Sequence, residues 1–171
     1  SRNVVALGLA SGFLEPLEST SIHFVQAGIS KLLAMFPDRS FNPVLEQEYN
    51  RLTEMQLNQV RDFIILHYKA NRRGEPFWRE VAAMEVPDGL ARKIELFQES
   101  GRIFRHEDEL FSQSSWLAVL LGQGIAPRRY DPLADAVPDE QVQPLLARMG
   151  SVIREAAGRM PPHERYIADH C

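Results

Sequence analysis

Two glutamates, Glu15 and Glu18, lie three positions apart beside a turn of small residues near the start of the chain. Gly8 and Gly12 belong to that turn, and a helix is predicted to begin near Ser19. Glycine tolerates positive φ and lets a backbone approach a ligand closely, while a helix start offers unpaired N–H groups and the positive end of its dipole. The segment therefore predicts an anion site flanked by carboxylates. A carboxylate at a helix start is also a common capping arrangement, which leaves a structural role open.

The element that leads into this turn is a continuous apolar run at residues 4–7, Val-Val-Ala-Leu. Such a run is typical of a strand buried on both faces in a parallel sheet, and a buried helical turn is the alternative. A parallel strand needs neighbours, and the sequence offers no second convincing strand. We therefore expect that its partners lie outside the chain, which predicts a piece of a larger fold.

The remainder of the chain is predicted to be helical. Apolar residues recur at helical spacing over residues 19–35, from Asn42-Pro43 to just before Gly74, over residues 88–99 and over residues 142–160. Asn42 followed by Pro43 is a clear helix start, and Gly101 is a clear stop. Residues 116–121 are apolar on all sides, which predicts a segment central to the core. Residues 128–137 form an irregular, proline-rich connection.

Composition narrows the class of protein. The 171 residues, 44% apolar and 25% charged, fit one globular domain of a soluble protein. A net charge of −4 without a basic block argues against nucleic acid as a partner. The apolar stretches are too short to span a bilayer, no secretory signal is expected, and the single Cys171 suits a cytoplasmic protein. His163, His170 and Cys171 are loosely spaced like metal ligands, but a fourth ligand is not evident and no metal is expected.

The string at residues 3–24 closely resembles the flavin-dependent tryptophan halogenases. Its core is Gly-Phe-Leu-Glu-Pro-Leu-Glu-Ser-Thr at residues 12–20, which is long and chemically unusual. The resemblance continues in weaker motifs at residues 77–79, 115–117, 122–127 and 160–163, so it covers essentially the whole chain. It implies a mainly α chain: the helical C-terminal substrate region of an FAD-dependent monooxygenase-like α/β fold, with one N-terminal strand and turn left from the flavin-binding sheet. Residues 1–24 would line flavin, halide and active site, and residues 25–171 would form one continuous substrate-binding or lid region.

The resemblance also implies a reaction and roles for residues. In that family reduced FAD, supplied by a separate flavin reductase, reacts with oxygen and chloride or bromide to give hypohalous acid, which halogenates an electron-rich aromatic. Glu18 takes the place of the catalytic glutamate, and Ser19 that of the serine linking the flavin and substrate compartments. Thr20 and Ser21 match the residues whose backbone amides hold the halide, although many members have glycine where this chain has Ser21. The turn that would pass the isoalloxazine ring comprises Gly8, Ala10, Ser11, Gly12, Phe13 and Leu14.

Substrate contacts are predicted at Glu107, Phe111 and Trp116. The segment at residues 105–113 is compact compared with enzymes that grip free tryptophan. We therefore expect an indole-like or larger aromatic, free or carried, as the substrate. The alternatives are a capped helix start with a solvated charged face for residues 105–113, and a core position for Trp116. A homodimer is an option that the sequence leaves open.

Several parts of the family pattern do not occur in these 171 residues. They are the dinucleotide-binding Gly-x-Gly-x-x-Gly, the catalytic lysine and the Trp-x-Trp-x-Ile-Pro segment. Lys31, Lys69 and Lys93 stand in unrelated contexts and are not substitutes for that lysine. The chain alone is therefore expected to bind FAD weakly and to give no product with flavin reductase, halide and indole. A related flavin monooxygenase that hydroxylates and a non-catalytic helical interaction module are the alternative functions.

Overall fold

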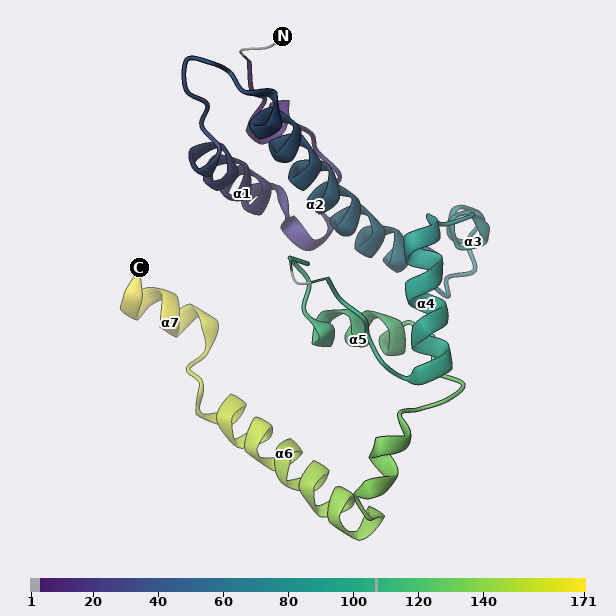
Figure 1. Ribbon diagram of the computed structural model, residues 1–171. Helices are drawn as coiled ribbons and strands as arrows, with labels where there is room; N and C mark the ends of the chain where they lie inside the picture. Colours follow the sequence, from purple (N-terminus) through teal and green to yellow (C-terminus); the bar gives the residue numbers. More distant parts are fainter. Residues whose placement is uncertain (1–3, 107) are drawn as a thin grey trace. The chain divides into compact units, whose positions relative to one another are not determined.

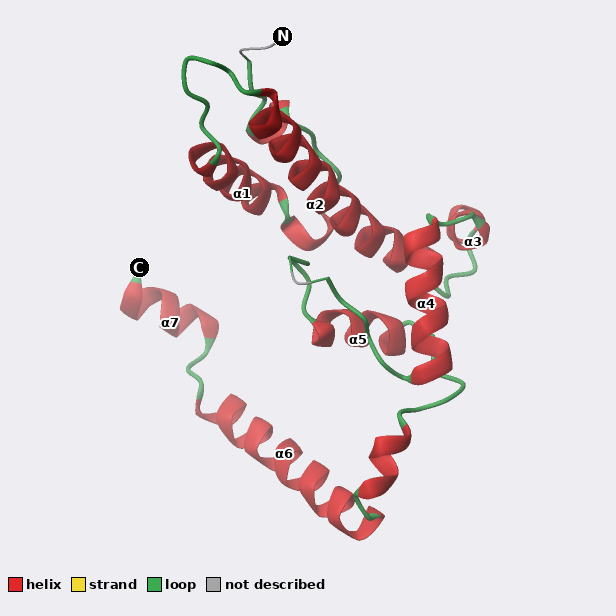
Figure 2. Cartoon of the chain, viewed as in Figure 1, coloured by secondary structure: helices red, strands yellow, loops and turns green. Residues whose placement is uncertain are grey.

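The computed structural model describes residues 4–106 and 108–171, and it divides into two compact units at residue 130 (Figure 1). The first unit, Ser1–Tyr130, carries the buried core, and the second is Asp131–Cys171. The predicted mainly α class is confirmed, since the described residues form helices and loops (Figure 2). The expected division at residue 24 is a functional one and stays a prediction.

The apolar run at residues 4–7 is not a strand in the described structure, so that expectation is corrected. Leu7 does have extended backbone angles, φ −131° and ψ 156°, but a strand is defined by pairing. Val4 and Val5 are 71% and 46% exposed, so the run is not buried either. Two short 3-10 turns follow, η1 (Gly8–Ala10) and η2 (Leu17–Ser19).

Two helices hold this N-terminal segment. Helix α1 (Ser21–Ala34) packs on η1, and helix α2 (Pro43–Lys69) contacts α1. A Cβ added to Gly28 in α1 would lie only 3.1 Å from Leu7 Cδ2, so glycine there allows the close approach of the segment. The predicted start of α2 is confirmed, because Asn42 Oδ1 accepts a hydrogen bond from the Val44 amide at 3.0 Å.

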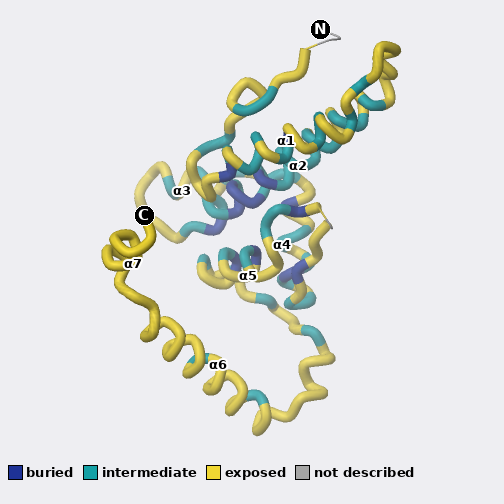
Figure 3. The backbone as a smooth tube through the Cα atoms, turned by 90° about the vertical axis from the view of Figure 1, so that its left-hand side faces the viewer, coloured by how far each residue is buried: buried dark blue, intermediate teal, exposed yellow. Residues whose placement is uncertain are grey.

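The core forms where the C-terminal half of α2 meets α4 (Asp88–Ser100) and α5 (Gln113–Gly122), as the buried parts of Figure 3 show. Gly101 ends α4 in a left-handed conformation with φ 68°, which confirms the predicted stop. Helix α3 (Pro76–Ala83), which the sequence analysis did not anticipate, packs on α2. The buried cluster comprises Phe63, Leu66, Ala70, Leu90, Phe97, Ile103, Trp116 and Leu120.

The second unit consists of η3 (Pro132–Ala136), α6 (Asp139–Arg159) and α7 (His163–His170). Helix α6 confirms the predicted last long helix, whereas α7 was not predicted. None of these three helices contains a buried residue. On α6 the apolar side chains of Leu145, Met149, Val152 and Ile153 are exposed. No helix in the described ranges combines the length and the apolarity needed to cross a membrane.

Candidate active site

Glu18 and Ser19 both have left-handed backbone conformations, with φ of 67° and 51°. Such angles cost a non-glycine residue on the order of 1–3 kcal/mol each, and they persist only where the surroundings enforce them. They also explain why α1 begins at Ser21 rather than near Ser19, because a right-handed helix cannot continue through them. The two adjacent strained residues set the direction of the Glu18 side chain at a cost in local stability.

The Glu18 side chain points to helix α2, where its Oε1 lies 3.1 Å from Nε2 of His67. The other ring nitrogen, Nδ1, lies 2.9 Å from the Phe63 carbonyl oxygen one helical turn earlier. The side chains of His67 and Glu18 are 17% and 33% exposed, so Glu18 remains accessible to a ligand while His67 is mostly covered. The sequence analysis did not identify His67 as a site residue, because this contact joins positions far apart in the sequence.

Glu15 has a different partner on the same helix. Its Oε2 accepts a hydrogen bond of 2.6 Å from the Tyr68 hydroxyl, and this bond raises the pKa of the Tyr68 phenol. Tyr68 is further held by stacking on Trp78 of α3, with ring centroids 5.9 Å apart. Neither η2 nor α1 has a side-chain hydrogen bond at its N-cap, so capping is not what the two glutamates do.

The predicted halide residues stand at the start of α1. Thr20 is the N-cap and is 3% exposed, and Ser21 is the first residue of the helix. The Ser21 amide therefore has no acceptor within α1. Serine is tolerated where many relatives have glycine because Ser21 is helical and is not among the positive-φ residues.

The predicted flavin segment, residues 8–14, has two glycines with positive φ, 63° at Gly8 and 145° at Gly12. The space beside Gly12 is open, since a Cβ there would meet no atom within 4 Å. Leu9 and Phe13 expose 72% and 56% of their surface. A bare backbone turn flanked by exposed apolar side chains suits the face of a planar, largely apolar ring, so the segment fits the flavin that the sequence implies.

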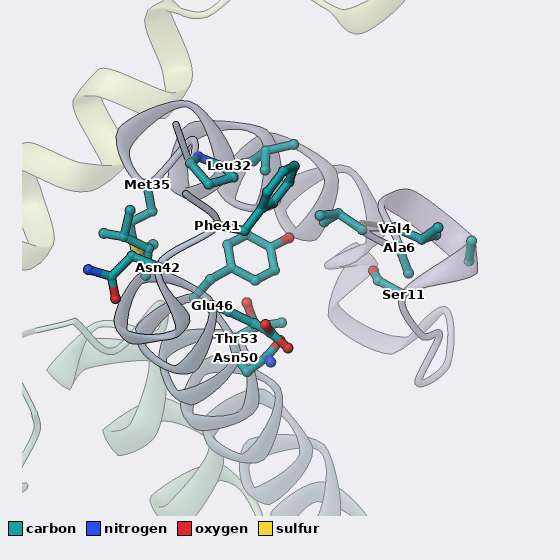
Figure 4. A pocket seen from close by; sticks show the side chains of 15 residues that line it. Val4, Ala6, Ser11, Leu32, Met35, Phe41, Asn42, Glu46, Asn50 and Thr53 are labelled. Carbon is teal, nitrogen blue, oxygen red and sulfur yellow. The ribbon is translucent and has the colours of Figure 1, made fainter. Parts of the chain in front are cut away.

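A cavity of about 370 Å³ opens beside this segment, between residues 4–11 and the facing ends of α1 and α2 (Figure 4). Its lining residues include Ala10 and Ser11 of this segment together with Phe41 and Tyr49. Neither Glu18 nor His67 lines it, so this cavity and the strained glutamate are separate features.

The predicted substrate residues have mixed outcomes. Glu107 lies outside the described residues. Phe111 stacks on Phe63 with ring centroids 3.8 Å apart, and Trp116 is 1% exposed and packs edge-on against the same ring. Ser112 caps α5 by accepting from the Ser115 amide at 3.1 Å, as the helix-start alternative predicts. Both aromatic rings thus belong to the core or its margin, and their contact with substrate stays a prediction.

The three lysines have structural partners. Lys31 Nζ donates to Gln56 Oε1 at 2.8 Å, and Lys69 Nζ donates to the Met84 carbonyl at 2.8 Å. Lys93 pairs with the buried Glu109, and its Nζ lies 4.1 Å from the centre of the Trp116 ring. These contacts agree with leaving the lysines out of the site.

The described residues contain no group of three or more His, Cys, Asp or Glu that could hold a metal ion. His170 of the loosely spaced C-terminal set stacks on Tyr166 instead, with ring centroids 4.2 Å apart.

Comparison with known proteins identifies the family of the chain. The family model described as tryptophan halogenase matches residues 1–139. A flavin-dependent halogenase from Brevundimonas sp. BAL3 is 45% identical with a TM-score of 0.94, over 99% of this chain and 35% of that one. One from Xanthomonas campestris is 46% identical with a TM-score of 0.91, over 100% and 35%.

Among curated proteins, a tryptophan 7-halogenase from Lentzea aerocolonigenes is 36% identical over 80% of this chain and 29% of its own length. The chain thus spans about a third of the length of the relatives that it matches. Because the family model matches residues 1–139, which is well over half of the sequence, the chain belongs to the tryptophan halogenase family.

Proposed function

We propose that this chain supplies the C-terminal part of a flavin-dependent halogenase, with Glu18 as its catalytic carboxylate. The observation that carries the proposal is the pair of left-handed residues, Glu18 and Ser19, which turns an accessible carboxylate toward His67 at a backbone cost. An observed backbone outlier is a reason to infer function, because folding alone does not favour it. The family match supplies the reaction class.

In the proposed reaction a ring carbon of the substrate attacks the halogen of hypohalous acid, the oxygen–halogen bond breaks, hydroxide leaves and the ring becomes a cation. Glu18 then accepts the proton from that carbon, and the electrons of the C–H bond restore the aromatic ring. Before that step, its negative charge stabilises the cation. Ser19 follows it directly, between the proposed halide amides of Thr20 and Ser21 and the glutamate.

The flavin is proposed to lie against residues 8–14. Bound in its reduced form, it would supply the activation of dioxygen, which is the oxidant that converts halide to hypohalous acid. The contribution of the chain is the bare turn around Gly12 and the apolar contacts of Leu9 and Phe13. A transient flavin reductase is the proposed partner for reduction.

An indole-like aromatic is the proposed substrate class. Two solved structures at 45% and 46% identity are described simply as flavin-dependent halogenases. Relatives whose names specify tryptophan, such as the 7-chloro-L-tryptophan 6-halogenase of Kutzneria sp. (strain 744), are less similar, at 33% identity. Phe111 and Trp116 also have their rings engaged with Phe63, which leaves little aromatic surface there for gripping a free amino acid.

The test is a product assay of the gene product that carries this sequence, with FAD, NADH, a flavin reductase and bromide. We expect brominated indole by mass spectrometry and slower turnover of free tryptophan. A hydroxylated product formed equally without halide would favour the monooxygenase alternative. Absence of both products from a folded, flavin-binding protein would contradict the proposed function, and a strong preference for free tryptophan would overturn the substrate class alone.

A further inference from the structure

We propose that His67 is a positioning residue for the catalytic carboxylate: its Nε2 holds Oε1 of Glu18 by a close polar contact and leaves the other carboxylate oxygen for the substrate. This inference rests on the proposed function, and it assigns a role to a residue of α2 that lies 49 positions beyond Glu18.

The argument begins with the hydrogens of the imidazole ring. The Phe63 carbonyl oxygen can only accept, so Nδ1 of His67, 2.9 Å away, must carry a hydrogen. In a neutral ring Nε2 would then be a bare acceptor facing Glu18 Oε1, another acceptor, at 3.1 Å. Two acceptors at that distance repel each other. The contact is favourable when the ring carries a second proton, because an imidazolium and a carboxylate attract each other.

The surroundings of His67 fix the direction of this contact. The ring meets the edge of Phe63, with centroids 5.0 Å apart and planes at 85°. Phe63 is 1% exposed and is itself held between Phe111 and Trp116. His67 therefore cannot swing away without disturbing the core. A rigidly held His67 ring opposite the strained backbone of Glu18 defines where the carboxylate points. Efficient proton transfer requires such a fixed direction.

Glu18 keeps one oxygen available in this arrangement. Among the described residues, the Glu18 side chain makes its polar contact with His67, through Oε1. The Glu18 side chain is a third exposed, so the carboxylate is accessible to a ligand while Oε1 contacts His67. The contact with His67 at Oε1 and a substrate proton arriving at Oε2 would thus use different oxygen atoms.

The kinetic test compares His67→Phe with His67→Gln in the gene product that carries this sequence. Phenylalanine removes the ring nitrogen that contacts Glu18, and we expect kcat to fall by ~10- to 100-fold, the size of effect expected for losing one polar contact to a charged group. We expect KM for indole to change by less than ~3-fold, because the effect acts on the reaction step. Glutamine keeps an N–H near the position of Nε2 and is expected to restore kcat to within ~5-fold of the wild type. A purely structural role for His67 predicts no rescue by glutamine.

Tyr68→Phe is the matched control, because it removes the neighbouring α2 bond to Glu15 and should leave kcat within ~2-fold. His67→Phe with unchanged kcat, or His67→Gln as slow as His67→Phe in a folded protein, would overturn the proposal.

A second measurement does not depend on turnover. Nitrogen NMR of 15N-histidine-labelled chain, with His67 assigned from the His67→Phe spectrum, should show Nε2 carrying or sharing a proton near neutral pH. Glu18→Gln should shift that signal toward an unprotonated nitrogen, whereas Glu15→Gln should leave it in place. Identical His67 signals in wild type and Glu18→Gln would refute the contact. If no halogenated product forms, the proposed function fails, yet the nitrogen signals still decide whether His67 holds Glu18.

Discussion

Glu15 and Glu18 belong to one short motif and are bound by consecutive residues of one helix, yet their environments differ. Glu15 accepts from the Tyr68 hydroxyl and has its Oε1 buried without a hydrogen-bond partner among the described residues. Glu18 is a third exposed, left-handed, and faces His67, a group that can carry or share a proton. Tyr68 thus anchors Glu15 in the fold, whereas His67 contacts a Glu18 that stays accessible to a ligand.

The difference teaches which glutamate is suited to chemistry. A carboxylate tied by a neutral phenol inside the fold stabilises the segment but offers no oxygen to a ligand. A carboxylate held by one oxygen near the surface can exchange a proton through the other. The partners of both glutamates come from the C-terminal half of helix α2, which contains the buried residues of that helix (Figure 3).

Exchanging the two glutamates for glutamine should separate these roles most strongly. In the gene product that carries this sequence, Glu18→Gln removes the proton acceptor, and we expect kcat to fall by ~10²- to 10⁴-fold. Glu15→Gln should leave kcat within ~3-fold, because Gln Oε1 still accepts from Tyr68. Initial rates of indole bromination measure both. Equal losses in the two variants would abolish the distinction.

Removing the hydroxyl of Tyr68 should test whether Glu15 has a structural role. Tyr68→Phe leaves the Glu15 carboxylate without its recorded hydrogen bond, and we expect unfolding to become easier by ~1–2 kcal/mol. Urea denaturation monitored by circular dichroism measures this loss. His67→Gln, which keeps a donor, is the comparison variant and should cost less. A Tyr68→Phe protein as stable as the wild type would show that Glu15 is not anchored by this bond.

The smallest effect should come from alkaline pH. The bond to Glu15 raises the pKa of Tyr68, so the protonated phenol stabilises the folded state. This stabilisation is complete below about pH 10, where an unfolded tyrosine ionises, and it is lost as the pH rises through the higher folded-state pKa. The stability gap between wild type and Tyr68→Phe should therefore narrow above about pH 10. A gap that widens there would contradict the assignment.

The sequence predicted the parts of this picture that depend on local chemistry. Asn42 and Pro43 begin α2 and Gly101 ends α4, because caps and breakers act over a few residues. The short α3 and α7 were missed, although Pro76 at the first position of α3 was an available signal. The run at residues 4–7 was wrongly predicted as a strand because pairing is not a local property.

The partners of the glutamates could not be predicted in this way. Tyr68 and Glu15 lie 53 positions apart, and helical periodicity says only that His67 shares the apolar side of α2. No residue pattern predicts the left-handed backbone of Glu18 and Ser19, since neither is glycine. Motif similarity identified the glutamate, and only the tertiary structure identified what holds it.

The central claim, that His67 acts through Glu18, is tested most directly by a double-mutant cycle on kcat for indole bromination. His67→Phe should cost ~10- to 100-fold in the wild-type background but less than ~3-fold when Glu18 is already glutamine, because the group that it positions is gone. The same fold-loss in both backgrounds would contradict the account, since His67 would then act independently of Glu18.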